Sequence, residues 1–335
     1  MLRNLMFGAA AIALAALSTP ASAQLAAGDV EIEGPMSHVE VFAAPKTDST
    51  VLGPRTYIGY INLMGVTVKV LQTALIHTPT NTTTATLKDF ALTSPKLPGR
   101  TTGGFIGGTA IIVGESINGQ VYASDVFSDL FEHVVVGEAT APVIVNDQVS
   151  RATINGMIIR PSTDKRMPAG APINGLGLKI DADAIDTGTL VAAEGYFSPS
   201  QNTLYYHTLE ADSARLLRPE ATQIGVLRAD CRVRGGGRDE IQVRGGVANP
   251  ADGLVIISIP SPTPNNPNRF VQVGTVQAVP DPATSNPVQG QFDADFRNLT
   301  IASGVCPTLV RARVNGTGAD GSIVSATVTA DMEGR

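Results

Sequence analysis

Residues 65–70 read GVTVKV, and this alternation of apolar and polar side chains decides the fold. In an extended chain the three valines would lie on one face and the threonine and lysine on the other, because successive strand residues point to opposite faces. Residues 292–297 (FDADFR) and 310–314 (VRARV) repeat the pattern. After residue 23 no long stretch has a helical period, and Asp125–His133 is the best candidate for a short helix. The sequence therefore predicts an all-β protein.

The composition excludes several classes of protein. The 335 residues are 43% hydrophobic and 16% charged, which argues against intrinsic disorder because disordered chains are rich in charge and poor in apolar residues. Ala, Glu, Lys, Leu and Arg do not dominate at a heptad period, so a coiled coil is excluded. The net charge of −6 argues against nucleic acid as a partner, because phosphate neutralisation requires a basic surface.

The first 23 residues have the pattern of a secretory signal peptide. Arg3 supplies the positive start, Leu5–Leu17 a short apolar segment, and Ala21-Ser22-Ala23 the small residues of a cleavage site. The apolar segment is too short to cross a bilayer, which requires about 20 helical residues. We therefore expect export to the periplasm, the cell surface or the medium, with no transmembrane segment after cleavage.

Two cysteines, Cys231 and Cys306, are predicted to form one disulfide, because an exported chain with an even cysteine count favours pairing. The pair has no nearby histidine, and the four histidines of the chain do not stand at a metal-ligand spacing. We therefore expect no metal site and no cofactor.

The chain also contains an internal repeat. Gly65–Val70 aligns without a gap with Gly175–Ile180, and each copy is later followed by a second pair of strands. On this alignment the first copy holds a long extra segment, Thr78–Phe105, rich in Thr, Pro and Gly. Such a segment is either a functional surface or a tolerated insertion, and the sequence does not decide between them.

Short strands with a glycine-containing entry strand and a strand-turn-strand closing are typical of an OB-like barrel. Residues 149–212, with Ile154-Asn155-Gly156, Leu178–Ala182, Val191–Tyr196 and Leu204–Leu209, resemble a family of small exported bacterial β-barrel domains of unknown function. The resemblance implies an envelope or extracellular setting and a non-enzymatic module. It supplies no catalytic residues.

The last third of the chain has seven strand-like runs separated by turn signals, the pattern of an immunoglobulin-like sandwich. These runs are Leu227–Arg234, Glu240–Gly245, Leu254–Ile259, Phe270–Val279, Phe292–Ile301, Leu309–Val314 and Ile323–Ala330. The chain has no Trp, so the buried tryptophan of true immunoglobulin domains is absent and the prediction is limited to an Ig-like fold.

These patterns predict a linear arrangement of segments. After a signal peptide (1–23) we expect an N-terminal extension (24–50), a first OB-like domain with a long insertion (51–140), a second OB-like domain (141–218) and an Ig-like β-sandwich with one disulfide (219–335).

Two groups of residues are candidates for binding. Arg232, Arg234 and Arg238 gather around a run of three glycines, where their guanidinium groups could bind anionic glycans or lipid headgroups. The pair Tyr205-Tyr206 could stack against a sugar.

The sequence favours a non-enzymatic envelope or extracellular protein that acts as a binding or structural module. Its partner would be an envelope protein, a polysaccharide or a second copy of the chain. The alternative is a hydrolase of an envelope or extracellular polymer, with Glu194 or Asp183 as acid and base. That mechanism requires two carboxylates about 5 to 10 Å apart across a cleft.

Overall fold

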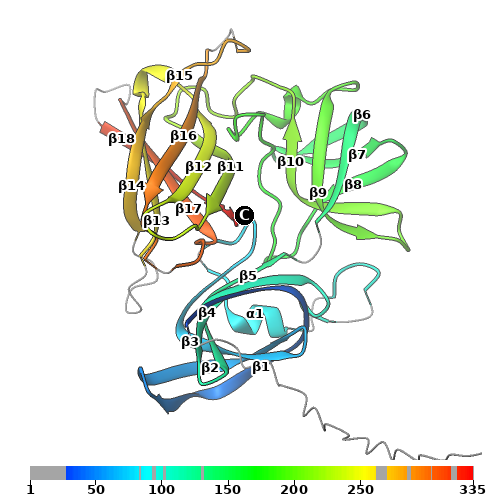
Figure 1. Ribbon diagram of the computed structural model, residues 1–335. Helices are drawn as coiled ribbons and strands as arrows, with labels where there is room; N and C mark the ends of the chain where they lie inside the picture. The colour runs from blue at the N-terminus through cyan, green and yellow to red at the C-terminus, as the bar shows by residue number, and fades with distance from the viewer. Residues whose placement is uncertain are drawn as a thin grey trace, which may run out of the picture.

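The computed structural model describes residues 28–334 apart from 83, 93–95, 101–102, 130–131, 262–269, 285–287, 303 and 318–322. These residues form three β-rich modules, each with its own hydrophobic core, which Figure 1 shows as three lobes. The prediction of an all-β fold is confirmed. The predicted signal peptide lies outside the described residues. Within the described part, no helix has the length and apolar character needed to span a membrane.

The first module, barrel 1, is a closed five-stranded barrel. Its strands are β1 (Gly28–Thr50), β2 (Gly53–Leu63), β3 (Val66–His77), β4 (Thr109–Ile117) and β5 (Gln120–Asp129). They are ordered β1-β2-β3-β5-β4, with β4 pairing back to β1 and with β3 and β5 parallel. This is an OB-like arrangement. Val68 and Val70 are buried in the barrel core and the half-buried Val66 packs against it, as the period of two predicts.

The connection from β3 to β4 carries the helix α1 (Leu87–Ala91). Thr86 and Asp89 cap its start reciprocally, and the buried Leu87 and Phe90 extend the barrel core. Phe105 stacks on Phe90 with ring centroids 4.8 Å apart, so the connection closes one end of the barrel (Figure 1). Described residues of the Thr78–Phe105 segment therefore help to build the core of barrel 1.

The second module, barrel 2, has the same topology. Its strands are β6 (His133–Val145), β7 (Gln148–Ile154), β8 (Met157–Pro161), β9 (Leu190–Ser198) and β10 (Thr203–Ala211), ordered β6-β7-β8-β10-β9 with β8 and β10 parallel. A short 3-10 helix, η1 (Ala182–Ala184), lies between β8 and β9. The prediction of two OB-like barrels in tandem is confirmed.

The expected register between the two copies is wrong. Gly65 lies in the turn before β3, and its counterpart in the turn before β8 is Gly156 rather than Gly175. Gly175–Ile180 belongs to the β8–β9 connection, where isolated bridges such as Ile180 to Leu216 give it a strand-like pattern. With the correct register the β3–β4 and β8–β9 connections have similar lengths, so Thr78–Phe105 is not an insertion peculiar to barrel 1.

The structure also moves the expected module boundaries. β1 begins at Gly28, so the segment expected to be an N-terminal extension contains the first strand of barrel 1. β6 begins at His133 and belongs to barrel 2, so barrel 2 starts before residue 141, the expected boundary. The expected short helix over Asp125–His133 is wrong, because the described residues there end β5 and begin β6.

The third module is a sandwich of two facing sheets. One sheet is ordered β15-β16-β12-β11-β19 and the other β14-β13-β17-β18. The strands are β11 (Ile224–Arg232), β12 (Asp239–Val247), β13 (Leu254–Pro260), β14 (Phe270–Gln277), β15 (Val279–Pro280), β16 (Gly290–Leu299), β17 (Leu309–Thr317), β18 (Ile323–Asp331) and β19 (Glu333–Gly334), with the 3-10 helix η2 at Pro250–Asp252. Seven of these strands match the seven predicted runs.

The predicted disulfide is confirmed. Cys231 on β11 bonds to Cys306, which lies just before β17, with their Cα atoms 5.7 Å apart. Since β11 and β17 belong to opposite sheets, the bond ties the two layers of the sandwich together.

Candidate functional site

Barrel 1 and the sandwich are joined by a buried polar cluster of His77, Asp125 and Thr308. His77 Nε2 lies 3.0 Å from Asp125 Oδ1 and 2.9 Å from Thr308 Oγ1, and the Thr308 hydroxyl donates to Asp125 Oδ2 at 2.7 Å. A catalytic relay uses the two ring nitrogens separately, one toward the carboxylate and one toward the hydroxyl. Here the same nitrogen faces both groups, so the cluster acts as a structural junction.

Barrel 1 and barrel 2 are joined through Arg166, which belongs to the β8–β9 connection of barrel 2 but contacts residues of barrel 1. Its side chain is only 2% exposed, forms a bidentate ion pair with Asp164, and donates from Nη1 to the Leu92 carbonyl at 3.2 Å. The guanidinium carbon lies 5.2 Å from the centre of the Phe105 ring. The side chains of Met167 and Tyr196 pack into the core of barrel 1 beside it.

Barrel 2 and the sandwich are joined by a third buried polar contact. The Asn174 amide donates to Gln289 Oε1 at 2.8 Å, and Gln289 Nε2 donates to the Ala214 carbonyl at 2.8 Å. Every pair of modules is therefore connected by hydrogen bonds between buried groups. Buried polar groups tolerate little displacement, so these contacts fix the orientation of the three modules.

A cleft of about 740 Å³ lies between barrel 1 and the sandwich. Its barrel wall comes from β1 to β5 and is largely polar, whereas its sandwich wall is largely apolar. The barrel wall consists of Asp29, Pro54, Arg55, Thr56, Leu71, Gln72, Thr73, Leu75, Val113, Gly114, Glu115, Ser124 and Asp125. The sandwich wall consists of Ile259, Pro260, Ser261, Ile301, Ala302, Val305, Cys306 and Pro307. We call this feature the barrel–sandwich cleft.

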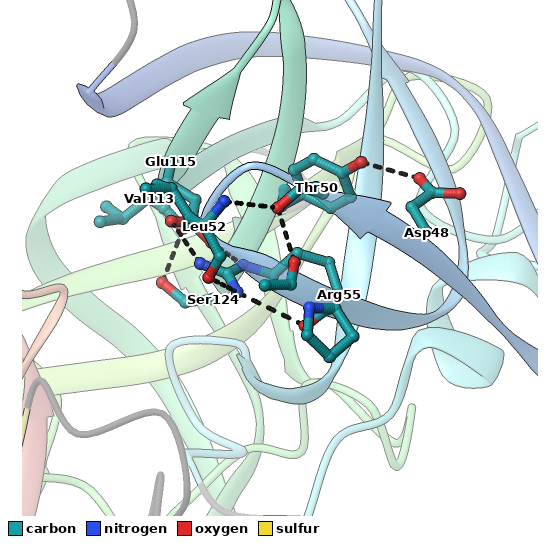
Figure 2. Close-up of polar contacts among 10 residues, drawn as sticks. Asp48, Thr50, Leu52, Arg55, Val113, Glu115 and Ser124 are labelled. Atoms are coloured by element: carbon teal, nitrogen blue, oxygen red, sulfur yellow. Dashed lines mark hydrogen bonds and ion pairs between the residues drawn. The ribbon is translucent and has the colours of Figure 1, made fainter.

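An ion pair between Arg55 of β2 and Glu115 of β4 dominates the barrel wall. The two side chains face each other (Figure 2). Arg55 Nη2 donates to Glu115 Oε2 at 3.1 Å, and Arg55 Nε donates to Glu115 Oε1. The hydrogen bond to Glu115 raises the pKa of Arg55, so the guanidinium stays charged. Arg55 Nη1 also donates to the Leu52 carbonyl at 3.2 Å, which ties the guanidinium to the β1–β2 turn.

A β-bulge places Ser124 at the cleft. Val113 pairs with Asp125 and Gly114 with Ala123, so Ser124 is the extra residue of β5, and its hydroxyl donates to the Val113 carbonyl at 3.3 Å (Figure 2). A Cβ atom on Gly114 would lie 2.1 Å from the Tyr122 carbonyl oxygen, so only glycine fits there. Bulges commonly redirect side chains next to functional sites.

The β1–β2 hairpin that carries Arg55 is held by a network centred on Asp48. The Asp48 carboxylate bonds to Lys69 and accepts from the Tyr122 hydroxyl at 2.7 Å and from the Tyr57 hydroxyl at 3.4 Å. The hydrogen bond from Lys69 lowers the pKa of Asp48, and burial raises the pKa of Tyr122 to about 12. These aromatic residues cannot be grouped from the sequence alone, because 65 residues separate Tyr57 from Tyr122.

The three predicted arginines do come together. Arg232, Arg234 and Arg238 line a hollow of about 350 Å³ on the sandwich with Glu240, Arg297 and Asn298, which we call the arginine hollow. Glu240 lies 3.2 Å from Arg234 and 3.6 Å from Arg297 and neutralises part of the charge. Arg297 could not be found by sequence proximity, because it enters from β16. Anion binding in this hollow stays a prediction.

Asp239 holds the glycine-rich turn beneath the arginine hollow. Its carboxylate accepts three backbone N–H bonds, from Arg234 at 2.9 Å, Gly235 at 2.8 Å and Ile301 at 2.8 Å. The bond from Ile301 has the largest effect on the carboxylate, and together the three bonds lower the pKa of Asp239.

Asp239→Asn is expected to lower the free energy of unfolding of the sandwich by about 2 kcal/mol at pH 7, because an amide offers fewer acceptor sites to the three donors. The folded-state pKa of Asp239 lies below the unfolded value, so its contribution is present above about pH 4 and is lost as the pH falls through the folded-state pKa. The difference between wild type and variant should therefore shrink at pH 3. Denaturant unfolding followed by far-UV circular dichroism at both pH values measures this, with the exposed Asp293→Asn as control. An equal difference at pH 3 and pH 7 would contradict it.

The tyrosine pair does not form a binding platform. Tyr206 is completely buried in the core of barrel 2, where its hydroxyl donates to the Val149 carbonyl at 2.8 Å, and burial raises its pKa. Tyr205 is half-buried and packs against the core of barrel 1. The expectation that both would be available to a ligand is wrong for Tyr206, because alternation along β10 places it inward.

The two carboxylates expected for hydrolysis lie in different settings. Asp183 is exposed on η1, whereas Glu194 on β9 lies with Asp129 of β5 and His207 of β10. His207 Nε2 lies 3.7 Å from Asp129 Oδ2, and burial lowers the pKa of His207 to about 4, so its imidazole is neutral. The geometry gives no support to an acid–base pair of Asp183 and Glu194.

Comparisons with protein-family models, curated proteins and solved structures found no match to this chain.

Proposed function

We propose that this protein works outside the cytoplasm as a non-enzymatic binding protein, and that it binds an oligosaccharide in the barrel–sandwich cleft. The observation that carries the proposal is the position of the cleft. Pro54, Arg55 and Thr56 of β2 and Gln72 and Thr73 of β3 line it, and the strand 2–3 face is where OB folds bind oligonucleotides and oligosaccharides.

The charges of the lining favour sugar over nucleic acid. Among the described residues that line the cleft, three are carboxylates, Asp29, Glu115 and Asp125, and Arg55 is the one cation. A phosphate backbone requires the opposite balance. Carboxylates can accept hydrogen bonds from sugar hydroxyl groups, and amides and hydroxyls can both donate to them and accept from them. The apolar sandwich wall can cover the carbon face of a sugar ring.

The cleft is suited to binding because its walls are held in place before any ligand arrives. The His77–Asp125–Thr308 cluster joins the two walls directly, and Cys306 in the sandwich wall is fixed by the disulfide. A preformed site loses less conformational entropy on binding than a mobile one. The disulfide and the signal-peptide pattern both support a location outside the cytoplasm.

Gln72→Ala is expected to weaken oligosaccharide binding about tenfold, the loss that corresponds to one or two hydrogen bonds. Gln72 is exposed on β3 in the cleft, and Gln272→Ala, on an exposed position of β14, is the matched control with the same change in side chain. Isothermal titration of the isolated protein against neutral and acidic envelope oligosaccharides measures both affinities.

The proposal is contradicted if the protein binds none of the oligosaccharides in the panel. It is also contradicted if Gln72→Ala and wild type bind with equal affinity. Chromatography of the recovered oligosaccharide adds a second readout. Intact sugar supports binding without catalysis, and shortened products would instead support hydrolysis.

A further inference from the structure

The junction between the two barrels holds a cluster of potential metal ligands. Asp129 ends β5 of barrel 1, Glu194 lies on β9 of barrel 2 and His207 lies on β10. One ligand atom from each residue falls within 4.8 Å of the other two. One imidazole nitrogen with two carboxylate oxygens is a donor set that suits zinc and neighbouring divalent transition metals.

His207 is aimed into this cluster by a β-bulge. Gly195 pairs with Tyr206 and Glu194 with Thr208, so His207 is the extra residue of β10, at the position that Ser124 occupies in barrel 1. The imidazole is 2% exposed, and among the described residues its Nε2 has no hydrogen-bond partner. A buried polar atom without a partner costs free energy, so its presence calls for an explanation.

The second ring nitrogen of His207 is already engaged. Nδ1 lies 3.0 Å from the Thr208 hydroxyl, and a hydrogen bond donated there leaves the lone pair on Nε2. Metal-bound histidines typically donate their other ring N–H in this way, which fixes the tautomer and the ring orientation.

The separations also match a single bound ion. Two ligands at about 2.0 to 2.2 Å from a tetrahedral zinc ion lie about 3.4 Å apart. The 3.7 Å between His207 Nε2 and Asp129 Oδ2 is too long for a hydrogen bond and close to this value. Glu194 is half-buried, so the third ligand lies nearest to solvent and leaves a route for the ion to enter.

We propose that Asp129, Glu194 and His207 bind one divalent transition-metal ion, zinc foremost, which clamps barrel 2 to barrel 1. The site is structural in this role, because its ligands come from both barrels and the bound ion links them. It is independent of the barrel–sandwich cleft.

The test is titration of the isolated full-length protein, after removal of metal with a chelator, with Zn²⁺ by calorimetry and with Co²⁺ by absorption spectroscopy. We expect one ion per chain, visible absorption bands typical of a Co²⁺ site with nitrogen and oxygen ligands, and a higher melting temperature with Zn²⁺. His207→Ala should weaken binding at least about 100-fold, because removing a ligand costs more than removing a second-sphere partner. His38→Ala, which removes an exposed histidine of β1, is the matched control and should bind as wild type does.

Glu194→Gln provides a second variant if His207→Ala does not fold, and it too should lose most of the affinity. The proposal is overturned if the metal-free wild type binds no Zn²⁺ more tightly than about 100 μM. It is equally overturned if a folded His207→Ala or Glu194→Gln variant binds Zn²⁺ as tightly as wild type. In either case the cluster is a polar contact between the barrels without a metal.

Discussion

The double substitution Cys231→Ala and Cys306→Ala is expected to lower the free energy of unfolding of the sandwich by about 4 kcal/mol. The disulfide closes a loop across a sequence separation of 75 residues, and without it the unfolded chain regains the corresponding entropy. The loss is large compared with the total stability of a single module, about 5 to 15 kcal/mol.

The distribution of tyrosine makes this effect measurable module by module. All six tyrosines lie between residues 57 and 206, so tyrosine fluorescence reports the barrels, while far-UV circular dichroism reports all three modules. We expect the variant to shift the unfolding transition that is followed by circular dichroism. The unfolding transition that is followed by tyrosine fluorescence should shift much less. Reduced wild type is the control, because it lacks the disulfide but carries no alanine substitutions. A variant within about 1 kcal/mol of oxidised wild type would contradict the entropic account.

Asp164→Asn is expected to destabilise the barrels by about 3 kcal/mol, because it leaves the Arg166 guanidinium buried without its negative partner. Asp164 and Arg166 have side-chain exposures of 8% and 2%, so water cannot compensate for the lost charge. The tyrosine fluorescence transition should move to lower denaturant concentration.

The matched control for this experiment is Asp212→Asn, which removes an exposed carboxylate of barrel 2. Exposed substitutions of this kind typically change stability by less than about 0.5 kcal/mol. Equal effects of the two substitutions would show that the buried ion pair contributes nothing specific to the docking of the barrels.

The sequence predicted the sandwich well because its strands alternate cleanly and are separated by glycine- and proline-rich turns. It failed at β1, where register shifts after Met36 and after Val41 interrupt the alternation. It also failed at α1, because five residues are too few to display a helical period. The register of the repeat was lost because β8 is much shorter than its counterpart β3.

The candidate sites depended on contacts that no local pattern records. The arginine hollow was found in part, because Arg232, Arg234 and Arg238 are close in the chain, while Arg297 enters from another strand. Arg55 and Glu115 are 60 residues apart and meet only when the barrel closes. The metal-ligand cluster draws on three strands of two modules, so the search for ligand spacings along the chain could not detect it.

The position of Met167 and Tyr196 in the core of barrel 1 has a consequence for synthesis. The strands of barrel 1 are complete at Asp129, yet the side chains that finish its interior follow some 40 to 70 residues later in the chain. During translation, which delivers the N-terminus first, the interior of barrel 1 would stay incomplete until most of barrel 2 had been synthesised. A fragment that ends between the two barrels would lack these core side chains. The smallest unit that can complete its fold on its own therefore contains both barrels.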